Sequence, residues 1–302
     1  MPVAVVVVAN PTSGRGKGAK LIPQAEAMLR SLGIDYRMEV SGSPADPERL
    51  AREAATSGAT VVAALGGDGH VGNVANGLVD SGTPAALAVI PAGTGNDYAA
   101  YLGLNAKQPM EAVRLLASPV TKMLDVVRVS TSEGERYFVN VGGTGFDSEA
   151  NEHANQVKLL KGTPKYIYST FVTLVKFKPA RFTIAVDGVE EEFPGMMVAV
   201  GNAISYGGGM KVTPGAKADD GELELCVLGA VPKRTFIATF PKVFKGTHVT
   251  HPSVRMLHGK EIRIAADRVF QVYGDGERMG PLPATFTVVP GALSVVIPPA
   301  SQ

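Results

Sequence analysis

Two aspartates stand inside glycine-rich segments, and this combination of residue types is where the sequence indicates chemistry most strongly. Asp68 lies within Gly66-Gly-Asp-Gly69, and Asp97 closes Pro91-Ala-Gly-Thr-Gly-Asn-Asp97. Glycine lets a backbone approach a ligand closely, and a helix that follows such a loop offers unpaired N–H groups to an anion. A carboxylate beside a phosphate is costly unless it serves Mg²⁺ or accepts a proton. The two segments therefore point to a phosphate-rich ligand, and a nucleotide fits that description best.

A third glycine-rich segment, Asn10-Pro-Thr-Ser-Gly14, precedes the other two in the chain. None of the three is a common nucleotide signature, because Gly14-Arg-Gly-Lys-Gly18 is not a dinucleotide-binding GxGxxG and no GxxxxGK[ST] phosphate loop is present. Each loop taken alone is equally compatible with a tight turn. Together, with an aspartate inside two of them, they favour a binding site.

The elements expected around these loops place all three at one edge of a sheet. Strands with few polar positions, each followed by a helical pattern, are typical of a parallel sheet covered on both faces. Loops at the carboxyl ends of such strands line one crevice, where ligands bind. The expected strands are 3–8, 34–40, 60–65 and 85–90, and the expected helices are 19–32, 47–56 and 71–79.

After about residue 124 the pattern changes to short, often alternating strands separated by Gly, Pro or Asp. We therefore expect an α/β nucleotide-binding domain with a Rossmann-like parallel sheet over residues 1–124, and a mostly antiparallel β domain over residues 125–289. The strands expected in the second domain are 124–130, 136–141, 181–187, 195–201, 222–228, 261–266, 269–273, 284–289 and 293–297, with helices at 147–160, 164–177 and 232–245.

Composition excludes several classes of protein. The net charge of +1, from 29 basic and 28 acidic residues among 302, disfavours a strongly basic nucleic-acid binder. The single Cys226 excludes an internal disulfide and a multi-cysteine zinc site. No apolar run approaches the roughly 20 residues that span a bilayer, and the first residues lack the charged region of a signal peptide. A cytoplasmic protein without a nucleic-acid partner is expected.

The order of Gly66–Gly69 and Pro91–Asp97 resembles the diacylglycerol kinase catalytic-domain family, which includes bacterial soluble lipid kinases, sphingosine kinases and ceramide kinases. The resemblance covers nearly the whole chain, because it extends to the segments Asn10–Gly14, Asn140–Asp147, Asp219–Glu224 and Gly274–Glu277. It implies an N-terminal α/β nucleotide domain, a C-terminal β-sandwich domain that takes the lipid acceptor, and ATP with Mg²⁺ bound between them. It also implies that the last strand, about 290–302, returns to the first domain.

The resemblance assigns roles to individual residues. Asp275 matches the family's proposed general base, which takes the proton of the lipid hydroxyl as that oxygen attacks the γ-phosphate of ATP. Asp68 and Asp97 would serve a Mg²⁺–water network near the phosphates. A structural Mg²⁺ would be held by the side chain of Asp220 and the backbone carbonyls of Lys217 and Glu222. The nucleotide-contacting positions are Asn10, Pro11, Thr12, Ser13, Gly14, Ser41, Gly66, Gly67, Asp68, Gly69, His70, Val71, Gly72 and Thr94.

One segment departs from the family pattern. The usual Gly-Gly-Asp-Gly-Thr-x-Asn-Glu is replaced here by a sequence with His70, Gly72 and Asn73. His70 retains a hydrogen-bond donor for a phosphate, but the carboxylate of the last position is lost.

Diacylglycerol is the leading acceptor, with phosphatidic acid as product, and several alternatives stay open. They are a kinase of another lipid (a sphingoid base, phosphatidylglycerol or a polyprenol), an NAD kinase, and a nucleotide- or lipid-sensing homologue with weakened catalysis. NAD kinases share the Gly-Gly-Asp-Gly loop but lack the Pro-x-Gly-Thr-x-Asn-Asp loop at this spacing.

Two segments carry basic residues interleaved with aromatic ones. Each is either a solvated helix that packs its aromatic rings inward or a patch that meets anionic headgroups. For a kinase whose substrate is a membrane lipid, the second reading predicts peripheral association with the inner face of the membrane; a homodimer stays open. The first segment holds Lys158, Lys161, Lys165, Tyr166, Ile167, Tyr168, Phe171, Lys176, Phe177, Lys178 and Arg181, and the second holds Lys233, Arg234, Phe236, Phe240, Lys242, Phe244 and Lys245.

Overall fold

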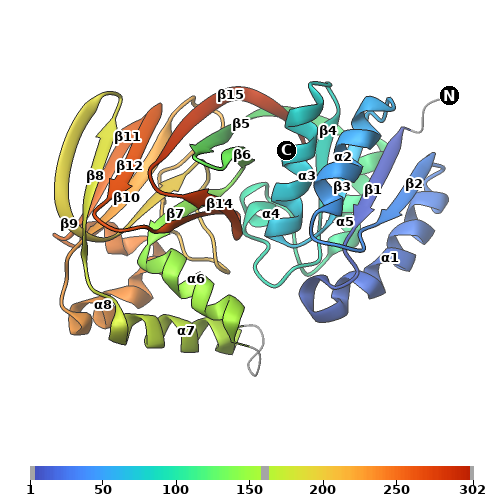
Figure 1. Ribbon diagram of the computed structural model, residues 1–302. Coiled ribbons are helices and arrows are strands. Elements are labelled where there is room, and N and C mark those ends of the chain that lie inside the picture. Colours follow the sequence, from blue (N-terminus) through green and yellow to red (C-terminus); the bar gives the residue numbers. More distant parts are fainter. Residues whose placement is uncertain (1–3, 158–162, 300–302) are drawn as a thin grey trace. The chain divides into compact units, whose positions relative to one another are not determined.

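Unit 1 of the structure is a parallel sheet with helices on both faces. The computed structural model describes residues 4–157 and 163–299, and the chain divides into unit 1, Met1–Val126 with Pro290–Gln302, and unit 2, Val127–Val289 (Figure 1). Alternate residues of the strands, such as Val5 and Val7, pack with Leu21 and Leu29 of the first helix in one apolar core. The elements of unit 1 are β1 (Val5–Ala9), α1 (Ser13–Ser31), β2 (Tyr36–Val40), α2 (Asp46–Thr56), β3 (Val61–Gly66), α3 (Asp68–Ser81), β4 (Ala86–Pro91), α4 (Asp97–Tyr101), α5 (Pro109–Arg114) and the 3₁₀ turn η1 (Leu115–Ala117).

The order of the unit 1 strands explains where its loops meet. β1 lies between β2 and β3, β4 lies beyond β3, and all these pairs are parallel. Loops after the carboxyl ends of β1, β3 and β4 therefore emerge at the same edge of the sheet. This edge carries the three glycine-rich segments.

Unit 2 is a mostly antiparallel β-sandwich with helices at one end. Its strands pair antiparallel throughout the ladders β8–β9, β7–β9, β9–β10 and β12–β8. The strand β5 (Val120–Thr131) enters unit 2 from unit 1, since the boundary falls after Val126. The further elements are β6 (Gly134–Phe138), β7 (Val141–Gly145), α6 (Phe146–Gln156), α7 (Thr163–Lys176), β8 (Ala180–Val186), β9 (Val189–Gly201), β10 (Leu223–Gly229), α8 (Lys233–Thr239), η2 (Phe240–Lys245), η3 (Thr247–Thr250), β11 (Val254–Gly259), β12 (Glu261–Ala266), β13 (Gln271–Gly274), β14 (Glu277–Pro281) and β15 (Ala284–Ile297). The predicted fold class, α/β followed by antiparallel β-sandwich, is confirmed.

Strand β15 belongs to both units and corrects a prediction. Residues 284–289 and 293–297 were expected as two strands, but they form one. The strand continues through Pro290-Gly291, where Gly291 adopts a φ of 56° that glycine tolerates and its N–H donates to the Asp125 carboxylate at 2.8 Å. The first residues of β15 pair with β12, and Val295 pairs in parallel with Leu87 of β4.

Two strands of unit 2, β11 and β14, have no counterpart among the predictions. The segment expected as one strand at 136–141 is also divided, because β6 ends at Phe138 and β7 begins at Val141. Among the described residues, no helix has the length and apolar character needed to cross a membrane.

Candidate functional site

Loop 1 (residues 10–14) is a tight turn organised by its asparagine. The Asn10 side-chain oxygen accepts hydrogen bonds from the N–H of Thr12 at 3.0 Å and from the Thr12 hydroxyl at 2.8 Å. Gly14 has a φ of 56°, and a Cβ there would lie 2.2 Å from the carbonyl oxygen of Ala92. Glycine is therefore required for both its conformation and its close contact, which brings loop 1 against the third glycine-rich segment.

Loops 2 (residues 66–69) and 3 (residues 91–97) touch backbone to backbone. A Cβ on Gly93 would lie 2.5 Å from the Cα of Gly67, and the Ala92 N–H donates to the Gly66 carbonyl at 2.8 Å. The Asp68 carboxylate accepts hydrogen bonds from the backbone N–H groups of Asn96 at 2.8 Å and Tyr98 at 3.1 Å. The structure thus brings the three predicted loops into one connected group.

Asn96 organises loop 3 and was not singled out from the sequence. Its backbone adopts a φ of 57°, its side-chain oxygen accepts from the Gly93 N–H at 2.7 Å, and its amide donates to the Gly93 carbonyl at 2.9 Å. Asparagine tolerates the left-handed region better than most residues and often bonds to nearby backbone. The presence of Asn directly after Gly95 is therefore the sequence signal that could have identified this position.

The two aspartates of the loops are close enough to influence each other. Burial raises the pKa of Asp68 above its ordinary value, and the charge of Asp97 raises it further, while the N–H groups of Tyr98 and Asn96 act in the opposite direction. Asp97 is buried at the start of α4. Two neighbouring, poorly hydrated carboxylates suit a hydrated Mg²⁺, which is usually bound through one or two carboxylates together with substrate phosphates.

His70 lies beneath loop 2. Its Nε2 contacts the Val8 carbonyl at 2.8 Å, so in the neutral ring this nitrogen carries the proton and donates it to β1. Burial lowers the pKa of His70 below its ordinary value, which favours the neutral ring. Val71 and Gly72 are buried with it, whereas Gly67, Asp68 and Gly69 remain partly accessible. The accessible part of this loop is therefore its backbone at the N-terminus of α3.

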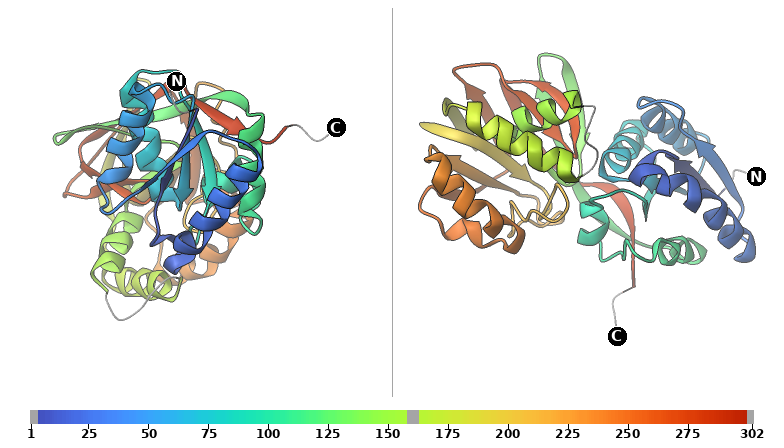
Figure 2. Two further views of the ribbon diagram at one scale, coloured as in Figure 1. Left: turned by 90° about the vertical axis from the view of Figure 1, so that its right-hand side faces the viewer. Right: turned by 90° about the horizontal axis from the view of Figure 1, so that it is seen from below.

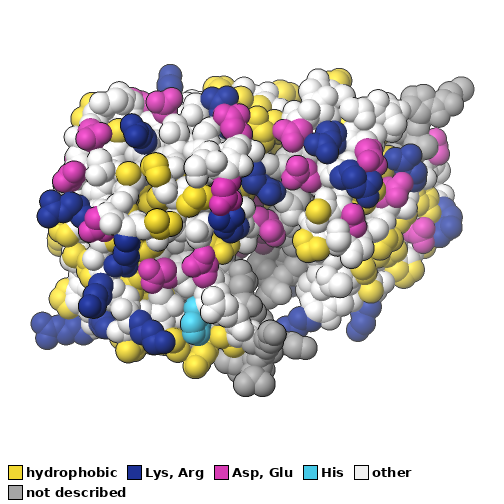
Figure 3. Space-filling view, in the orientation of Figure 1, with side chains coloured by type: hydrophobic (Ala, Val, Ile, Leu, Met, Phe, Trp, Pro, Cys, Tyr) yellow, Lys and Arg dark blue, Asp and Glu magenta, His cyan; other side chains and the backbone are white. Residues whose placement is uncertain are grey.

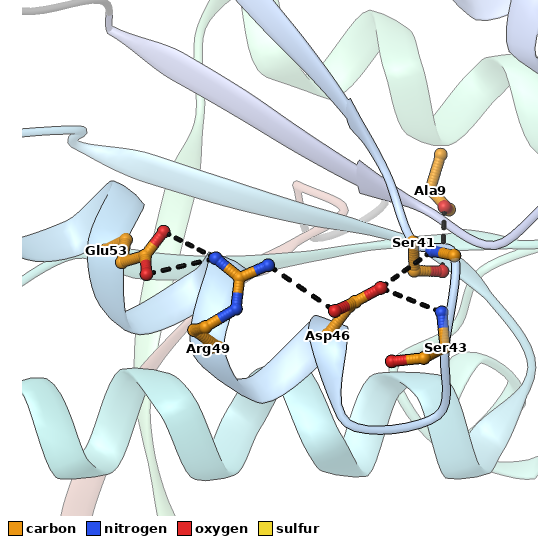
Figure 4. A network of polar contacts seen from close by, with 7 residues as sticks. Ala9, Ser41, Ser43, Asp46, Arg49 and Glu53 are labelled. Carbon is orange, nitrogen blue, oxygen red and sulfur yellow. Dashed lines mark hydrogen bonds and ion pairs between the residues drawn. The ribbon is translucent and has the colours of Figure 1, made fainter.

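Ser41 lies at the end of β2, beside loop 1. Its N–H and its hydroxyl both donate to the Ala9 carbonyl, at 2.9 Å and 3.1 Å. Asp46 holds the following turn through the N–H groups of Gly42 and Ser43 (Figure 4). Thr94, by contrast, is exposed in loop 3.

Asp275 lies in unit 2, in the turn between β13 and β14. Its two carboxylate oxygens accept hydrogen bonds from the N–H groups of Val139 at 2.8 Å and Asn140 at 3.0 Å. Its own N–H donates to the Val141 carbonyl, with a φ of 53°. The side-chain oxygen of Asn140 is buried without a partner among the described residues. Asn140 was quoted only as part of a motif, and the structure adds it to this polar group.

The predicted structural metal site also lies in unit 2. The Asp220 carboxylate accepts the N–H of Glu222 at 3.1 Å, and the side chains of Lys217, Asp220 and Glu222 are exposed. Within the described residues, no cluster of three His, Cys, Asp or Glu side chains is arranged to hold a metal. A cation at this turn would therefore depend on one carboxylate with backbone carbonyls and water.

Comparisons with known proteins agree across both units. The profile of the diacylglycerol kinase catalytic domain matches residues 4–129, and that of the YegS C-terminal NAD kinase beta sandwich-like domain matches residues 140–297. A diacylglycerol kinase of Mycobacterium tuberculosis is 35% identical over 97% of this chain and 95% of its own length. A diacylglycerol kinase of Bacillus subtilis is 27% identical with the same coverage.

Solved structures show the same fold. A diacylglycerol kinase from Bacillus anthracis str. Sterne superposes with a TM-score of 0.75 at 22% identity, covering 99% of this chain and 98% of that one. A second structure from the same organism gives a TM-score of 0.79 at 24% identity with the same coverage. The succession of an α/β unit and a β-sandwich is therefore shared along the entire chain.

Proposed function

The chain belongs to the diacylglycerol kinase catalytic-domain family, and from this premise we propose that it phosphorylates the hydroxyl of diacylglycerol, giving phosphatidic acid. The protein is a lipid kinase, an ATP-dependent phosphotransferase with an alcohol acceptor. The choice of diacylglycerol rests on relatives such as the Mycobacterium tuberculosis enzyme, which match nearly the whole chain.

The observation that carries the nucleotide part is the interlocking of the three glycine-rich loops. Gly14 contacts Ala92, Gly67 contacts Gly93, and Asp68 bonds to loop 3, so the loops form one backbone-lined edge. The first turn of α3 contributes unpaired N–H groups by helix geometry. We assign the ATP phosphates to this edge. They would be bound by backbone N–H groups of the loops and not by the side chains of residues 70–72.

Asp275 is the proposed general base. The hydroxyl proton of the acceptor passes to its carboxylate as the acceptor oxygen forms a bond to the γ-phosphorus, and ADP leaves with the electron pair of the broken P–O bond. Two backbone N–H donors hold the carboxylate in one orientation, which a base acting on a positioned hydroxyl requires. Asn140, whose N–H is one of these two donors to the Asp275 carboxylate, also has a buried side-chain oxygen.

Asp68 and Asp97 are the residues proposed to hold Mg²⁺ through water beside the phosphates, and Asp220 with the carbonyls of Lys217 and Glu222 is the proposed structural site. When bound, Mg²⁺ supplies charge neutralisation on the phosphate oxygens. Of these residues, Asp68 also has a structural task, since it joins loop 2 to loop 3.

The acceptor is tested directly by transfer of label from γ-labelled ATP in the presence of Mg²⁺. Diacylglycerol, ceramide, sphingosine and phosphatidylglycerol are offered in mixed micelles, with NAD as a soluble alternative. We expect labelled phosphatidic acid as the main product. Preferential labelling of another lipid or of NAD would replace diacylglycerol as the acceptor, and the absence of label despite ATP binding would support the weakened homologue.

The base is tested with Asp275→Asn. The amide cannot accept the hydroxyl proton, so turnover should fall by roughly two to four orders of magnitude while ATP affinity is retained. Glu277→Gln, which changes a carboxylate two residues away at the start of β14, is the matched control and should keep most activity. Equal loss in both variants, or an active Asp275→Asn protein with an unchanged fold by circular dichroism, would contradict the assignment.

A further inference from the structure

Helix α7 exposes three apolar side chains, although it also buries Leu174 in the core of unit 2. Tyr168, Phe171 and Val175 are 48%, 51% and 69% exposed, and their spacing places them on one helical face. On the opposite side the helix buries Ser169 and Thr173. A surface helix normally turns its apolar face inward, so the reading in which all these aromatic rings pack inward is wrong for this helix. Of the positions predicted in this segment, Lys158 and Lys161 lie outside the described residues, as do the side chains of Lys165, Tyr166 and Ile167.

A second segment continues this apolar surface. Ile237 on α8 and Phe244 on η2 are 48% and 46% exposed, whereas Phe236 packs edge-on against the buried Phe146. The Lys233 side chain donates to the Val175 carbonyl and so ties the start of α8 to the end of α7. The view from below in Figure 2 looks onto both helices at this end of unit 2.

The two segments that form this surface carry charges of one sign, and the nearby Glu149 and Glu152 of α6 line a hollow together with Lys176. Residues 163–186 and 225–260 contain no Asp or Glu. In Figure 3, dark-blue basic side chains border apolar ones at the lower left, over α7 and α8. Arg255 and Arg278 elsewhere in unit 2 pair with glutamates. Arg268 donates to the Lys178 carbonyl just after α7 and pairs with Glu149 of α6. In the part of the chain that the structure describes, no such ion pair ties the exposed Lys176, Lys178, Arg234, Lys242 and Lys245.

We propose that this surface, the α7–α8 face, docks on a bilayer that contains anionic phospholipid. The face consists of the apolar Tyr168, Phe171, Val175, Ile237 and Phe244 and the basic Lys176, Lys178, Arg234, Lys242 and Lys245. Apolar side chains that enter the acyl boundary beside unpaired cations that meet headgroups are the two components of interfacial binding. The inference rests on the proposed lipid kinase function and adds the surface through which the enzyme reaches its substrate.

The charge component is tested by sedimentation with vesicles of phosphatidylcholine alone or mixed with phosphatidylserine, without ATP. Wild-type protein should bind the mixed vesicles more tightly, and added NaCl should weaken this binding. The double variant Lys242→Gln/Lys245→Gln should lose roughly 30-fold in affinity for mixed vesicles, since each lysine near an anionic surface contributes about fivefold. Lys107→Gln/Lys260→Gln, which removes two exposed lysines that do not belong to the face, is the control and should bind like wild type.

The apolar component is tested with Phe171→Ser. This variant should lower the affinity for vesicles roughly tenfold, because the phenyl ring that would be buried in the bilayer is removed. Val189→Ser/Val269→Ser removes apolar side chains that are 75% and 73% exposed elsewhere in unit 2, and should leave binding unchanged. Wild-type-like binding by the variants of the face, or equal binding to both vesicles, would overturn the inference. A wild-type dimer without lipid that Phe171→Ser converts to a monomer would overturn it as well, by assigning the face to a second copy.

A separate assay keeps this inference distinct from the proposed function. All variants should transfer phosphate to short-chain diacylglycerol dispersed in detergent within about twofold of wild type, since no bilayer is involved. If wild type lacks this transfer but binds mixed vesicles through the α7–α8 face, the acceptor assignment fails and the docking surface stands.

Discussion

Several aspartates of this protein act by holding backbone N–H groups far away in the sequence. Asp68 accepts N–H groups from residues 96 and 98, Asp275 from 139 and 140, and Asp187 from 260 and 261. The sequence identified Asp68 and Asp275 by their glycine neighbours and by resemblance. It gave no indication of the N–H partners, because separations of 28 to 136 residues are set by the fold. The sequence thus singles out these residues as candidates, whereas their hydrogen-bond partners are set by the fold.

His70 makes the stability of unit 1 depend on pH. Burial lowers its pKa in the folded protein below the ordinary 6.5, so below that pH the unfolded chain binds a proton more readily than the folded one. The free energy of unfolding should therefore fall as pH decreases from 7 to 5. His70→Gln can still donate to the Val8 carbonyl but does not titrate, so it should show a shallower slope in urea denaturation across this range.

The matched control for this measurement is His258→Gln, at an exposed position on β11. Comparing slopes rather than single stabilities removes the contribution of other titrating groups. One such group is Asp147, whose pKa burial raises to about 6 and whose contribution runs in the opposite direction. Parallel slopes for wild type and His70→Gln would show that His70 is not the source.

At the scale of elements, alternation of strands and helices was readable in unit 1, whereas glycine obscured parts of unit 2. β7 reads Val-Gly-Gly-Thr-Gly and has little strand character. Its glycines are explained by neighbours: a Cβ at Gly143 would lie 2.3 Å from the Asp147 carboxylate, and one at Gly142 would lie 2.8 Å from the Phe138 ring. Such close contacts exist only in the folded chain, so the pattern of residues alone did not indicate a strand.

The contact between loops 2 and 3 should not tolerate a side chain. Gly93→Ala places a methyl group 2.5 Å from the Cα of Gly67, and the obstacle is backbone that cannot rotate away. We expect a loss of about 1–3 kcal/mol in the free energy of unfolding and at least tenfold weaker ATP binding by calorimetry.

Gly229→Ala at the end of β10 is the control for this substitution. The nearest atom to a Cβ there is 3.5 Å away, an ordinary contact distance. Both proteins gain the same methyl group, so a difference between them reports the loop contact. Unchanged ATP affinity and stability in Gly93→Ala would mean that the loops separate freely and do not act as one edge.

At the scale of the whole molecule, unit 1 consists of two separate stretches of the sequence, and unit 2 lies between them in the chain. Unit 1 includes the end of β15, where Leu293, Val295 and Val296 are buried. Val296 packs in the same apolar core as Val5 and Leu65. The boundary between the units is consequently crossed by the chain twice, at 126–127 and at 289–290.

Unit 1 should therefore require residues 290–302 to fold. A fragment of residues 1–126 leaves β4 without its β15 neighbour and should show no cooperative thermal transition. Joining residues 290–302 through a flexible linker should restore the transition, because each buried valine contributes roughly 1.5–3 kcal/mol. The same fusion with Val295→Asp is the control and should remain unfolded. Cooperative melting of the 1–126 fragment by itself would contradict the requirement.

The return of β15 also fixes an order of events during synthesis. A ribosome releases the residues of unit 2 as one uninterrupted stretch, whereas the sheet of unit 1 waits for residues that are translated about 200 positions after the end of β4 at Pro91. The half of the protein that is made first is thus the half that is completed last. Until then its nascent sheet carries an unpaired edge at β4, the kind of surface that chaperones shield during translation.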